Sequence, residues 1–301
     1  MREVSNINPY LIAGPNVLVK PATKPLSKQH EMSFGNMPNE GGFLLLSVTE
    51  AEQVIENQEV PARFIRPFLG SQEFIRGTER RCVWITDDDL HEASKVAWLH
   101  ERFAAVRKQR ANSDRATTKA LASTPHRFGE VRQTGTERVI AVPRVSSENR
   151  DYLPVGLVGR GTIIGDRNFA LYDAPLWNMA LIASRLHWVW IGTVCVRMRT
   201  DFSYSNTLGW NTFPVPKLTE KNRADLTAAA EGILLAREAH FPATIADLYD
   251  PEKMPANLRA AHDHNDEVLE RIYIGRRFRN DTERLEKLFE MYTKMTTKVS
   301  A

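Results

Sequence analysis

The pattern of apolar residues changes near Pro216, and this change limits the folds open to the chain. Before it, short apolar runs with β-branched residues, such as residues 139–142, alternate with helical segments. After it, apolar residues recur only at helical spacing, as in residues 226–234. We therefore expect an α+β protein, with a mixed α/β domain over residues 1–216 and a small helical domain over residues 217–301.

The composition is that of an ordinary soluble globular protein. Of the 301 residues, 42% are hydrophobic and 26% are charged, and the formal net charge is +3. The two cysteines, Cys82 and Cys195, lie far apart and form no CxxC pair, which favours a reducing compartment over a disulfide framework or a zinc site. The first ten residues contain no apolar stretch of signal-peptide type, so we expect a cytoplasmic protein.

Several secondary-structure elements can be placed from local signals. Residues 175–198 form the most apolar stretch, but polar side chains interrupt it, so we expect a buried helix and no membrane span. Asp87 or Asp88 would cap a long amphipathic helix that ends in the basic residues 107–110. Further expectations are strands at residues 16–20, 43–47, 81–86, 153–157 and 162–165, and a helix at 49–58 capped by Ser47 or Thr49.

Positive charge is concentrated in the middle of the chain. Residues 100–150 contain eleven Lys or Arg and five acidic residues, a local excess of +6. Clustered positive charge is typical of a protein that binds a polyanion, because its affinity comes largely from neutralised phosphates. A helix with a solvated basic face would give the same count, so both interpretations stay open at this point.

The stretch from residue 138 to residue 154 presents polar side chains at the end of a predicted strand. Residues 139–142 are apolar, and Pro143 then interrupts regular pairing because it has no amide hydrogen. The hydrogen-bonding side chains that follow are Arg144, Ser146, Ser147, Glu148 and Arg150. A strand that delivers donors and acceptors into a loop is one way in which folds present a recognition site. A solvated turn with ordinary surface charges is the alternative.

No catalytic or metal site can be recognised in the sequence. Residues 159–165 have GxGxxxG spacing without a strand–turn–helix frame, which fits a β-turn better than a nucleotide site. The Asn-Pro-Tyr at residues 8–10 lacks the second proline of an NPPY-type motif, and too few residues precede it to hold a cofactor-binding strand. His262 and His264 point to different faces of a helix, so we interpret them and Asp266 as solvated residues. No Glu-x-Lys or GxSxG motif is present.

Short runs in a fixed order span nearly the whole chain. They include Ile7-Asn-Pro-Tyr-Leu11, Phe34-Gly-Asn-Met-Pro-Asn39, Phe64-Ile-Arg-Pro-Phe68, Thr124-Pro-His126, Pro143-Arg-Val-Ser-Ser-Glu148, Tyr204-Ser-Asn-Thr-Leu208 and Ala246-Asp-Leu-Tyr-Asp250. Together these runs resemble the C-terminal portion of MmeI-like type IIL restriction–modification proteins. Those are large chains that join a nuclease, an adenine DNA methyltransferase, a target recognition domain and a helical tail.

The resemblance implies that residues 1–216 form a DNA target recognition domain and that residues 217–301 form the helical C-terminal domain. The nuclease and the methyltransferase, with its S-adenosylmethionine site, would lie before Met1. We therefore expect no cofactor and no catalytic residue in this chain, which would be an excised piece, a truncated product or a separate specificity subunit. The expected partners are double-stranded DNA and a methyltransferase domain or subunit, and no membrane.

The resemblance also implies which residues face DNA. The first patch is Arg144, Ser146, Ser147, Glu148 and Arg150, in which arginine can donate to guanine and glutamate can accept from the amino group of cytosine. The second patch is Arg199, Tyr204, Ser205 and Asn206, and Arg66 and Lys24 are expected phosphate contacts. The structural alternative for the second patch is that it only buttresses the domain junction.

Two functions from other classes are the alternatives. One is a helical protein–protein scaffold, or a specificity subunit without direct DNA readout, in which the basic stretch is a solvated face. The other is an enzyme in its own right, which binding of S-adenosylmethionine by the isolated chain would reveal.

Overall fold

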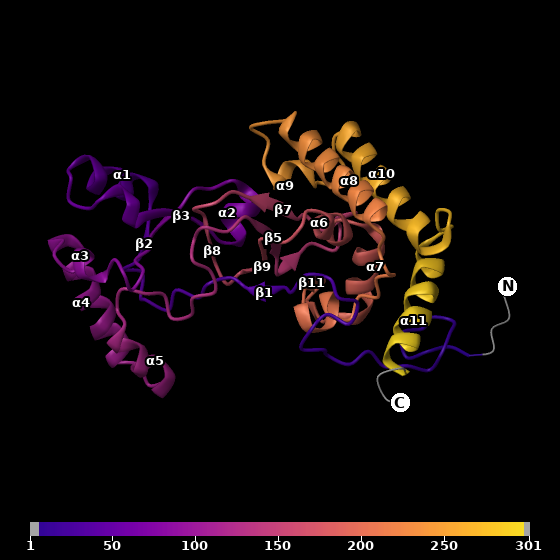
Figure 1. Ribbon diagram of the computed structural model, residues 1–301, viewed down its shortest axis with the longest axis horizontal. Helices are drawn as coiled ribbons and strands as arrows, with labels where there is room; N and C mark the ends of the chain where they lie inside the picture. Colours follow the sequence, from indigo (N-terminus) through magenta and orange to yellow (C-terminus); the bar gives the residue numbers. More distant parts are fainter. Residues whose placement is uncertain (1–5, 298–301) are drawn as a thin grey trace. The chain divides into compact units, whose positions relative to one another are not determined.

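The computed structural model describes residues 6–297, and the chain divides into two compact units. Unit 1 takes in the residues up to Met32, Ile140–Leu157 and the residues from Asp173 onward; unit 2 comprises Ser33–Val139 and Val158–Tyr172. Helices and short strands occur in both units, and the described chain after residue 217 contains helices and no strand (Figure 1). The expected α+β fold, a mixed α/β part followed by a helical part, is confirmed.

Unit 2 is built around a four-stranded sheet. The strand order is β2 (Leu45–Leu46), β4 (Arg81–Val83), β3 (Ile65–Leu69) and β8 (Ile163–Ile164), in which only the β3–β8 pairing is parallel. Two more strands, β1 (Ser33–Phe34) and β9 (Asn168–Tyr172), pair antiparallel. The helices are α1 (Val48–Glu56), α2 (Ser71–Arg76), α3 (Leu90–Ala93), α4 (Ala97–Ala111) and α5 (Ala116–Ala120), with 3-10 turns at Ala62–Phe64 and Leu121–Ser123.

The core of unit 2 forms because the apolar side chains of its helices and strands face one another. Leu44, Phe64 and Cys82 of the sheet region are buried together with Leu99 and Val106 of α4. Burial of a large apolar side chain stabilises a fold by about 1.5–3 kcal/mol, so this cluster contributes substantially to the stability of the unit.

The helix starts of unit 2 are set locally. The hydroxyl oxygen of Ser47 accepts the N–H of Glu50, so Ser47, and not Thr49, is the N-cap of α1. Such a bond satisfies one of the amide groups that a helix N-terminus leaves without a partner. Helix α3 begins after Asp89, so the cap expected at Asp87 or Asp88 was wrong by one or two residues.

Two segments expected to form one long helix each contain two helices, so the expectation of an unbroken helix was wrong in both. In residues 87–110, Val96 takes an extended conformation (φ −80°, ψ 112°) and packs against the core, which separates α3 from α4. In residues 175–198, Ser184 is extended (ψ 156°) and its hydroxyl accepts the N–H of His187, which separates α6 from α7. The second helix ends at Val194, so the residues after it are free to form a strand.

Unit 1 combines short strands with long helices. Its strands are β6 (Val145–Ser146), β10 (Arg197–Met198) and β11 (Asp201–Ser203), while β5 (Val139–Pro143) and β7 (Gly156–Val158) cross the unit boundaries along the chain. Its helices are α6 (Trp177–Ile182), α7 (Arg185–Val194), α8 (Glu220–Glu238), α9 (Ile245–Leu248), α10 (Ala256–Ile274) and α11 (Asp281–Thr297), with a π-helical turn at Asn206–Trp210.

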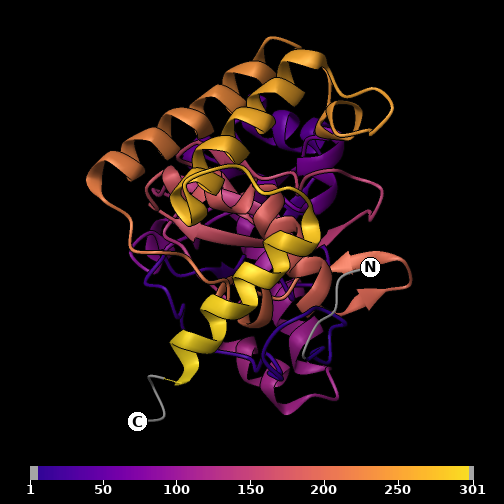
Figure 2. The same cartoon turned by 90° about the vertical axis from the view of Figure 1, so that its right-hand side faces the viewer.

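The helical segment, residues 218–297, follows the expected apolar spacing. Helices α8 and α10 lie side by side and α11 packs on α7 (Figures 1 and 2). Leu226 and Ile233 of α8 and Leu258 and Leu269 of α10 are fully buried. Among the described helices, none is both long and apolar enough to cross a membrane.

The expected strand at residues 16–20 is absent, so that expectation was wrong. Side-chain hydroxyls take up the amide groups that a neighbouring strand would have paired. The N–H of Val19 donates to the hydroxyl of Tyr10 (3.0 Å), and the N–H of Lys20 donates to that of Tyr292 (3.1 Å). Apolar alternation alone does not make a strand when the chain has no strand beside it.

Candidate nucleic-acid interface

A three-stranded sheet in unit 1 brings together the two expected recognition patches. The recognition loop, residues 144–150, contains β6, which pairs antiparallel with β11 through Ser146 and Phe202. Strand β11 pairs in turn with β10, where Arg197 lies opposite Phe202. The loop and the residues that follow α7, about fifty positions later in the sequence, therefore form one surface.

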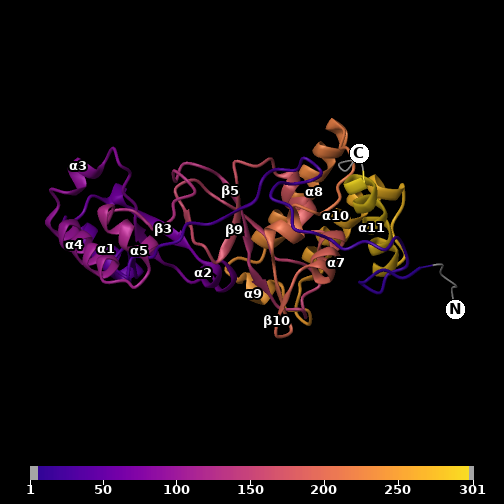
Figure 3. The same cartoon turned by 90° about the horizontal axis from the view of Figure 1, so that it is seen from below.

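Strands β10 and β11 form a hairpin, residues 196–203, that projects from the body of unit 1 (Figures 2 and 3). Its turn contains Arg199, whose φ of 60° lies in the left-handed region that favours glycine. Two apolar side chains on the hairpin are exposed, Val196 at 69% and Met198 at 58%. An exposed, cationic and partly apolar hairpin is suited to entering a groove of a nucleic acid.

The base of the hairpin is held by aromatic and ionic contacts. The Phe202 ring meets Trp188 of α7 edge to face, with ring centroids 4.6 Å apart. The Arg197 guanidinium lies over the Phe202 ring at 4.6 Å and pairs with the carboxylate of Glu148 at 2.5 Å. The Glu148–Arg197 pair links the recognition loop to the hairpin.

A polar cleft of about 730 Å³ opens beside the recognition loop. The loop contributes Ser147, Asn149 and Arg150, and the other wall is formed by Ala246, Tyr249, Asp250, Pro251 and Glu252. Residues with amide and guanidinium donors and residues with carboxylate acceptors therefore line the same opening. That is the set of groups that can read the donor and acceptor pattern of base edges in DNA.

Arg150 is the central cation of this cleft. It is half-buried, and its guanidinium donates to the hydroxyl of Ser146 at 3.1 Å. Burial lowers the pKa of Arg150 from its ordinary value, although arginine stays charged at any physiological pH. The cost of burying a cation is offset when an anion or a base acceptor binds to it.

Several expected contact residues serve the internal framework of unit 1. Ser146 and Tyr204 are only 3% and 4% exposed. The Tyr204 hydroxyl and Nε2 of His187 are hydrogen-bonded at 2.9 Å. Ser205 accepts the N–H of Leu208. Burial raises the pKa of Tyr204 well above its usual range. These contacts match the structural alternative, in which the run at residues 204–206 is a buttress.

The remaining expected contact residues lie on other parts of the chain. Asn206 donates from its amide to the carbonyl oxygen of Met32 in unit 1. Lys24 is exposed in the N-terminal connection, with its ammonium 3.9 Å from Glu31. Arg66 is half-exposed on β3 in unit 2. Arg144 and Ser147 are half-exposed and Glu148 is exposed, all three in the recognition loop.

The basic residues of segment 100–150 belong to both units, since the division lies at residue 140. Several of them have partners within their own unit. Arg110 is fully buried in unit 2, where its guanidinium donates to five carbonyl oxygens at 2.7–3.4 Å. Arg102 and Arg127 pair with Glu50 and Asp87. These three arginines therefore stabilise the fold of unit 2.

The interpretation of His262 and Asp266 as solvated residues was wrong. His262 is fully buried and Asp266 is 3% exposed, because this side of α10 packs against α7 and the residues after the recognition loop. Burial lowers the pKa of His262 well below its usual range and raises that of Asp266 to about 7. Within residues 6–297, no three His, Cys, Asp or Glu side chains gather as a metal site would require.

Sequence reasoning missed Arg197, Asn149 and the acidic wall of the cleft. Arg197 fell inside the long helix expected at residues 175–198. The alternation of polar and apolar residues from Val196 to Ser203, around a two-residue turn, is the pattern of a hairpin and could have identified it. No local signal places Asp250 and Glu252 opposite the recognition loop.

Comparisons with known proteins agree over nearly the whole chain. Residues 13–217 match the family model described as MmeI, target recognition domain, and residues 218–300 match that described as MmeI, C-terminal domain. DNA methyltransferase A of Bacillus subtilis (strain 168) is 39% identical over 293 residues, which are 97% of this chain and 33% of that protein.

A solved structure of the Type IIL restriction-modification enzyme MmeI in complex with DNA is also similar to this chain. It matches with a TM-score of 0.90 at 33% sequence identity, over 98% of this chain and 39% of that one. The chain thus spans about a third of the length of DNA methyltransferase A and about two fifths of that of the solved chain.

Proposed function

The chain belongs to the MmeI family, as its target recognition domain followed by its C-terminal domain, and from this premise we propose that it binds duplex DNA sequence-specifically. In this proposal it supplies the specificity of an adenine DNA methyltransferase. The methyltransferase part of such a protein would bind S-adenosylmethionine and flip the target base, and this chain would read the surrounding sequence.

The observation that carries the proposal is the cleft beside the recognition loop. Arg150 and Asn149 supply donors on one wall, and Asp250 and Glu252 supply acceptors on the other. The half-buried Arg150 lines this open polar cleft and donates to the hydroxyl of Ser146. The edge of guanine in the major groove is a suitable ligand for it, because O6 and N7 accept two hydrogen bonds from one guanidinium.

The proposed roles differ between residues. Arg150 and Arg144 donate to base acceptors, and Glu148 accepts from a base amino group after leaving Arg197. Ser147 is within the same loop and is assigned to base or sugar contact. Arg199 at the hairpin tip contacts phosphate or enters a groove.

The test is binding of the 301-residue chain to a pool of duplexes with randomised positions, followed by titration with the selected duplex. We expect Arg150→Ala to flatten the preference at one or two base positions by about tenfold or more. Lys24→Ala should weaken all duplexes about equally and reduce the slope of log affinity against log salt by about one. Binding without salt dependence, or equal behaviour of the two variants, would refute this assignment.

A further inference from the structure

The residues that follow the recognition loop are held by the helices of unit 1. The carboxylate of Asp151 pairs with Arg259 of α10 at 2.9 Å, and its carbonyl oxygen accepts from Arg185 of α7 at 3.0 Å. Four residues on, the carbonyl oxygen of Val155 accepts from Arg237 of α8 at 2.5 Å. Three helices therefore fix the backbone on which the loop depends.

Tyr152, between these two anchors, contacts α10 through both its ring and its hydroxyl. Its ring stacks on His262 of α10, with centroids 4.2 Å apart and planes 17° from parallel. Its hydroxyl donates to the carboxylate of Asp266 at 3.0 Å. The other oxygen of that carboxylate accepts the backbone N–H of Arg185 at 2.7 Å, which joins the start of α7 to the same point.

The opposite wall of the cleft also contacts His262. Tyr249 lines the cleft, and its hydroxyl lies 2.7 Å from Nε2 of His262. Arg237 donates to the same hydroxyl from Nε at 2.9 Å. His262 thus touches Tyr152, two residues after Arg150, on one side and Tyr249, directly before Asp250, on the other.

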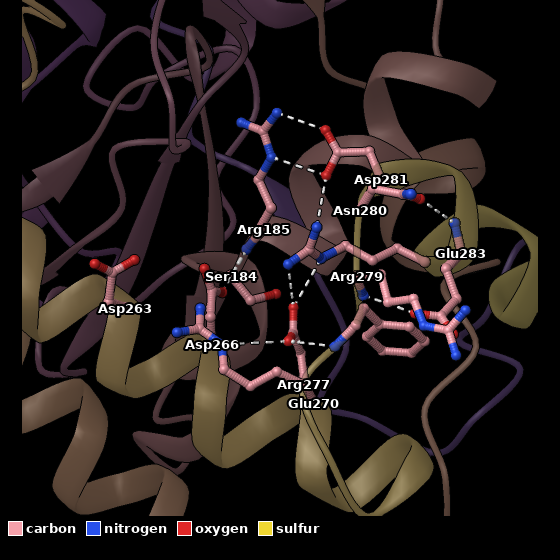
Figure 4. Close-up of polar contacts among 12 residues, drawn as sticks. Ser184, Arg185, Asp263, Asp266, Glu270, Arg277, Arg279, Asn280, Asp281 and Glu283 are labelled. Atoms are coloured by element: carbon pink, nitrogen blue, oxygen red, sulfur yellow. Dashed lines mark hydrogen bonds and ion pairs between the residues drawn. The ribbon is translucent and has the colours of Figure 1, made fainter.

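A charged network keeps this part of α10 in place (Figure 4). Arg185 forms a two-point contact with Asp281 of α11, at 2.7 and 3.2 Å. Glu270, one turn after Asp266 and fully buried, accepts from Arg284 at 2.7 Å and from the N–H of Phe278 at 2.9 Å. These bonds tie α7, α10 and α11 together behind the histidine.

We propose that His262 and Asp266 are positioning residues for DNA reading, which set the width of the cleft by holding Tyr249 in one wall and Tyr152 behind the other. This inference rests on the proposed function, because it concerns the same cleft. In this inference, neither His262 nor Asp266 touches DNA. Together they hold the two walls at the separation at which Arg150 and the acidic wall meet the same base pairs. In this proposal the helical segment contributes to DNA recognition, although its residues lie outside the part of the chain that matches the target recognition domain.

The experiment removes one hydroxyl at a time. Tyr152→Phe and Tyr249→Phe each delete a bond to α10 and keep the ring. Tyr273→Phe is the matched control, because Tyr273 lies on α10, is also buried, and donates its hydroxyl to the carbonyl oxygen of Pro214 at 2.6 Å, away from the residues that line the cleft. For each protein we measure the affinity for the selected duplex, the affinity for a scrambled duplex, the salt slope and the thermal midpoint.

We expect the two cleft variants to lose about tenfold of the affinity ratio between selected and scrambled duplexes, with an unchanged salt slope. The control should keep the ratio even where its thermal midpoint falls by a similar amount. The double variant should lose less than the product of the single losses, because the deleted bonds end on Asp266 and His262, which lie one turn apart on α10. A ratio that is unchanged in the cleft variants, or reduced equally in the control, would overturn the positioning role. A wild-type chain without sequence preference would instead overturn the proposed function.

Discussion

The carboxyl group of Asp266 allows a quantitative test of how the helical segment is assembled. Burial is the main cause that raises its pKa from the ordinary 3.8 to about 7, and Glu270 on the same helix raises it further. The N–H of Arg185, the hydroxyl of Tyr152 and the charge of Arg284 lower it and do not outweigh burial. Folding therefore favours the protonated form of Asp266.

The direction of the pH effect follows from this difference. A carboxyl group whose pKa is higher in the folded than in the unfolded state stabilises the protein fully only below the unfolded pKa. That contribution is lost as the pH rises through the folded pKa, here about 7. A difference of about three pKa units is worth about 4 kcal/mol in total, and about 2–3 kcal/mol of it is lost between pH ~5 and pH ~8.

Asp266→Asn removes this titration and keeps the size and hydrogen-bonding capacity of the side chain. We expect the free energy of unfolding of the wild type to fall by about 2–3 kcal/mol relative to the variant over that pH range. Urea denaturation of both proteins at several pH values measures it. The other groups that face this carboxyl, His262, Asp263 and Glu270 on α10 and Arg185 and Arg284 on α7 and α11, are common to both proteins. Parallel stability curves would refute the reasoning.

Three further predictions concern single side chains. Glu270→Gln leaves Arg284 without its buried anion and should lower the free energy of unfolding by about 3 kcal/mol in urea denaturation. Gly192→Val should cost about 1–3 kcal/mol, because even a methyl group at this position would lie 3.2 Å from the ring of Phe202, and faster proteolysis of the hairpin would accompany it. Arg199→Gly should raise stability by about 1 kcal/mol, measured as an increased thermal midpoint, because glycine adopts a φ of 60° without steric cost; a decrease would show that the tip is not strained.

The elements that could be predicted are those with strong local signals. Helices α8, α10 and α11 have regular apolar spacing, and Ser47 is a typical N-cap. The break at Ser184 was not predicted, because the few polar residues of the mostly apolar stretch 175–198, such as Asn178 and His187, are themselves buried and mark no solvent-facing side of a helix. Strands of two residues could not be predicted either, because whether such a short segment forms a strand depends on a partner strand elsewhere in the chain.

Some parts of the candidate site could likewise be predicted from the sequence, and others could not. The recognition loop could be located because Pro143 ends an apolar strand and polar residues follow it. The burial of Ser146 and Tyr204 could not be predicted. A polar side chain is buried only where a specific partner, such as His187 for Tyr204, meets it in the folded chain. The acidic wall of the cleft comes from residues about a hundred positions away, which no local pattern connects to the loop.

In the hairpin of residues 196–203, the side chains that attach it to the rest of unit 1 are different from those exposed at its tip. Phe202 and Arg197 at its base make the bonds to Trp188 and Glu148, while the side chains at residues 198–200 near its tip lie outside those bonds. Mutations at the tip therefore leave the supporting interactions intact and cost little stability. A hairpin built in this way accepts new tip sequences without a compensating change in the residues that hold its base.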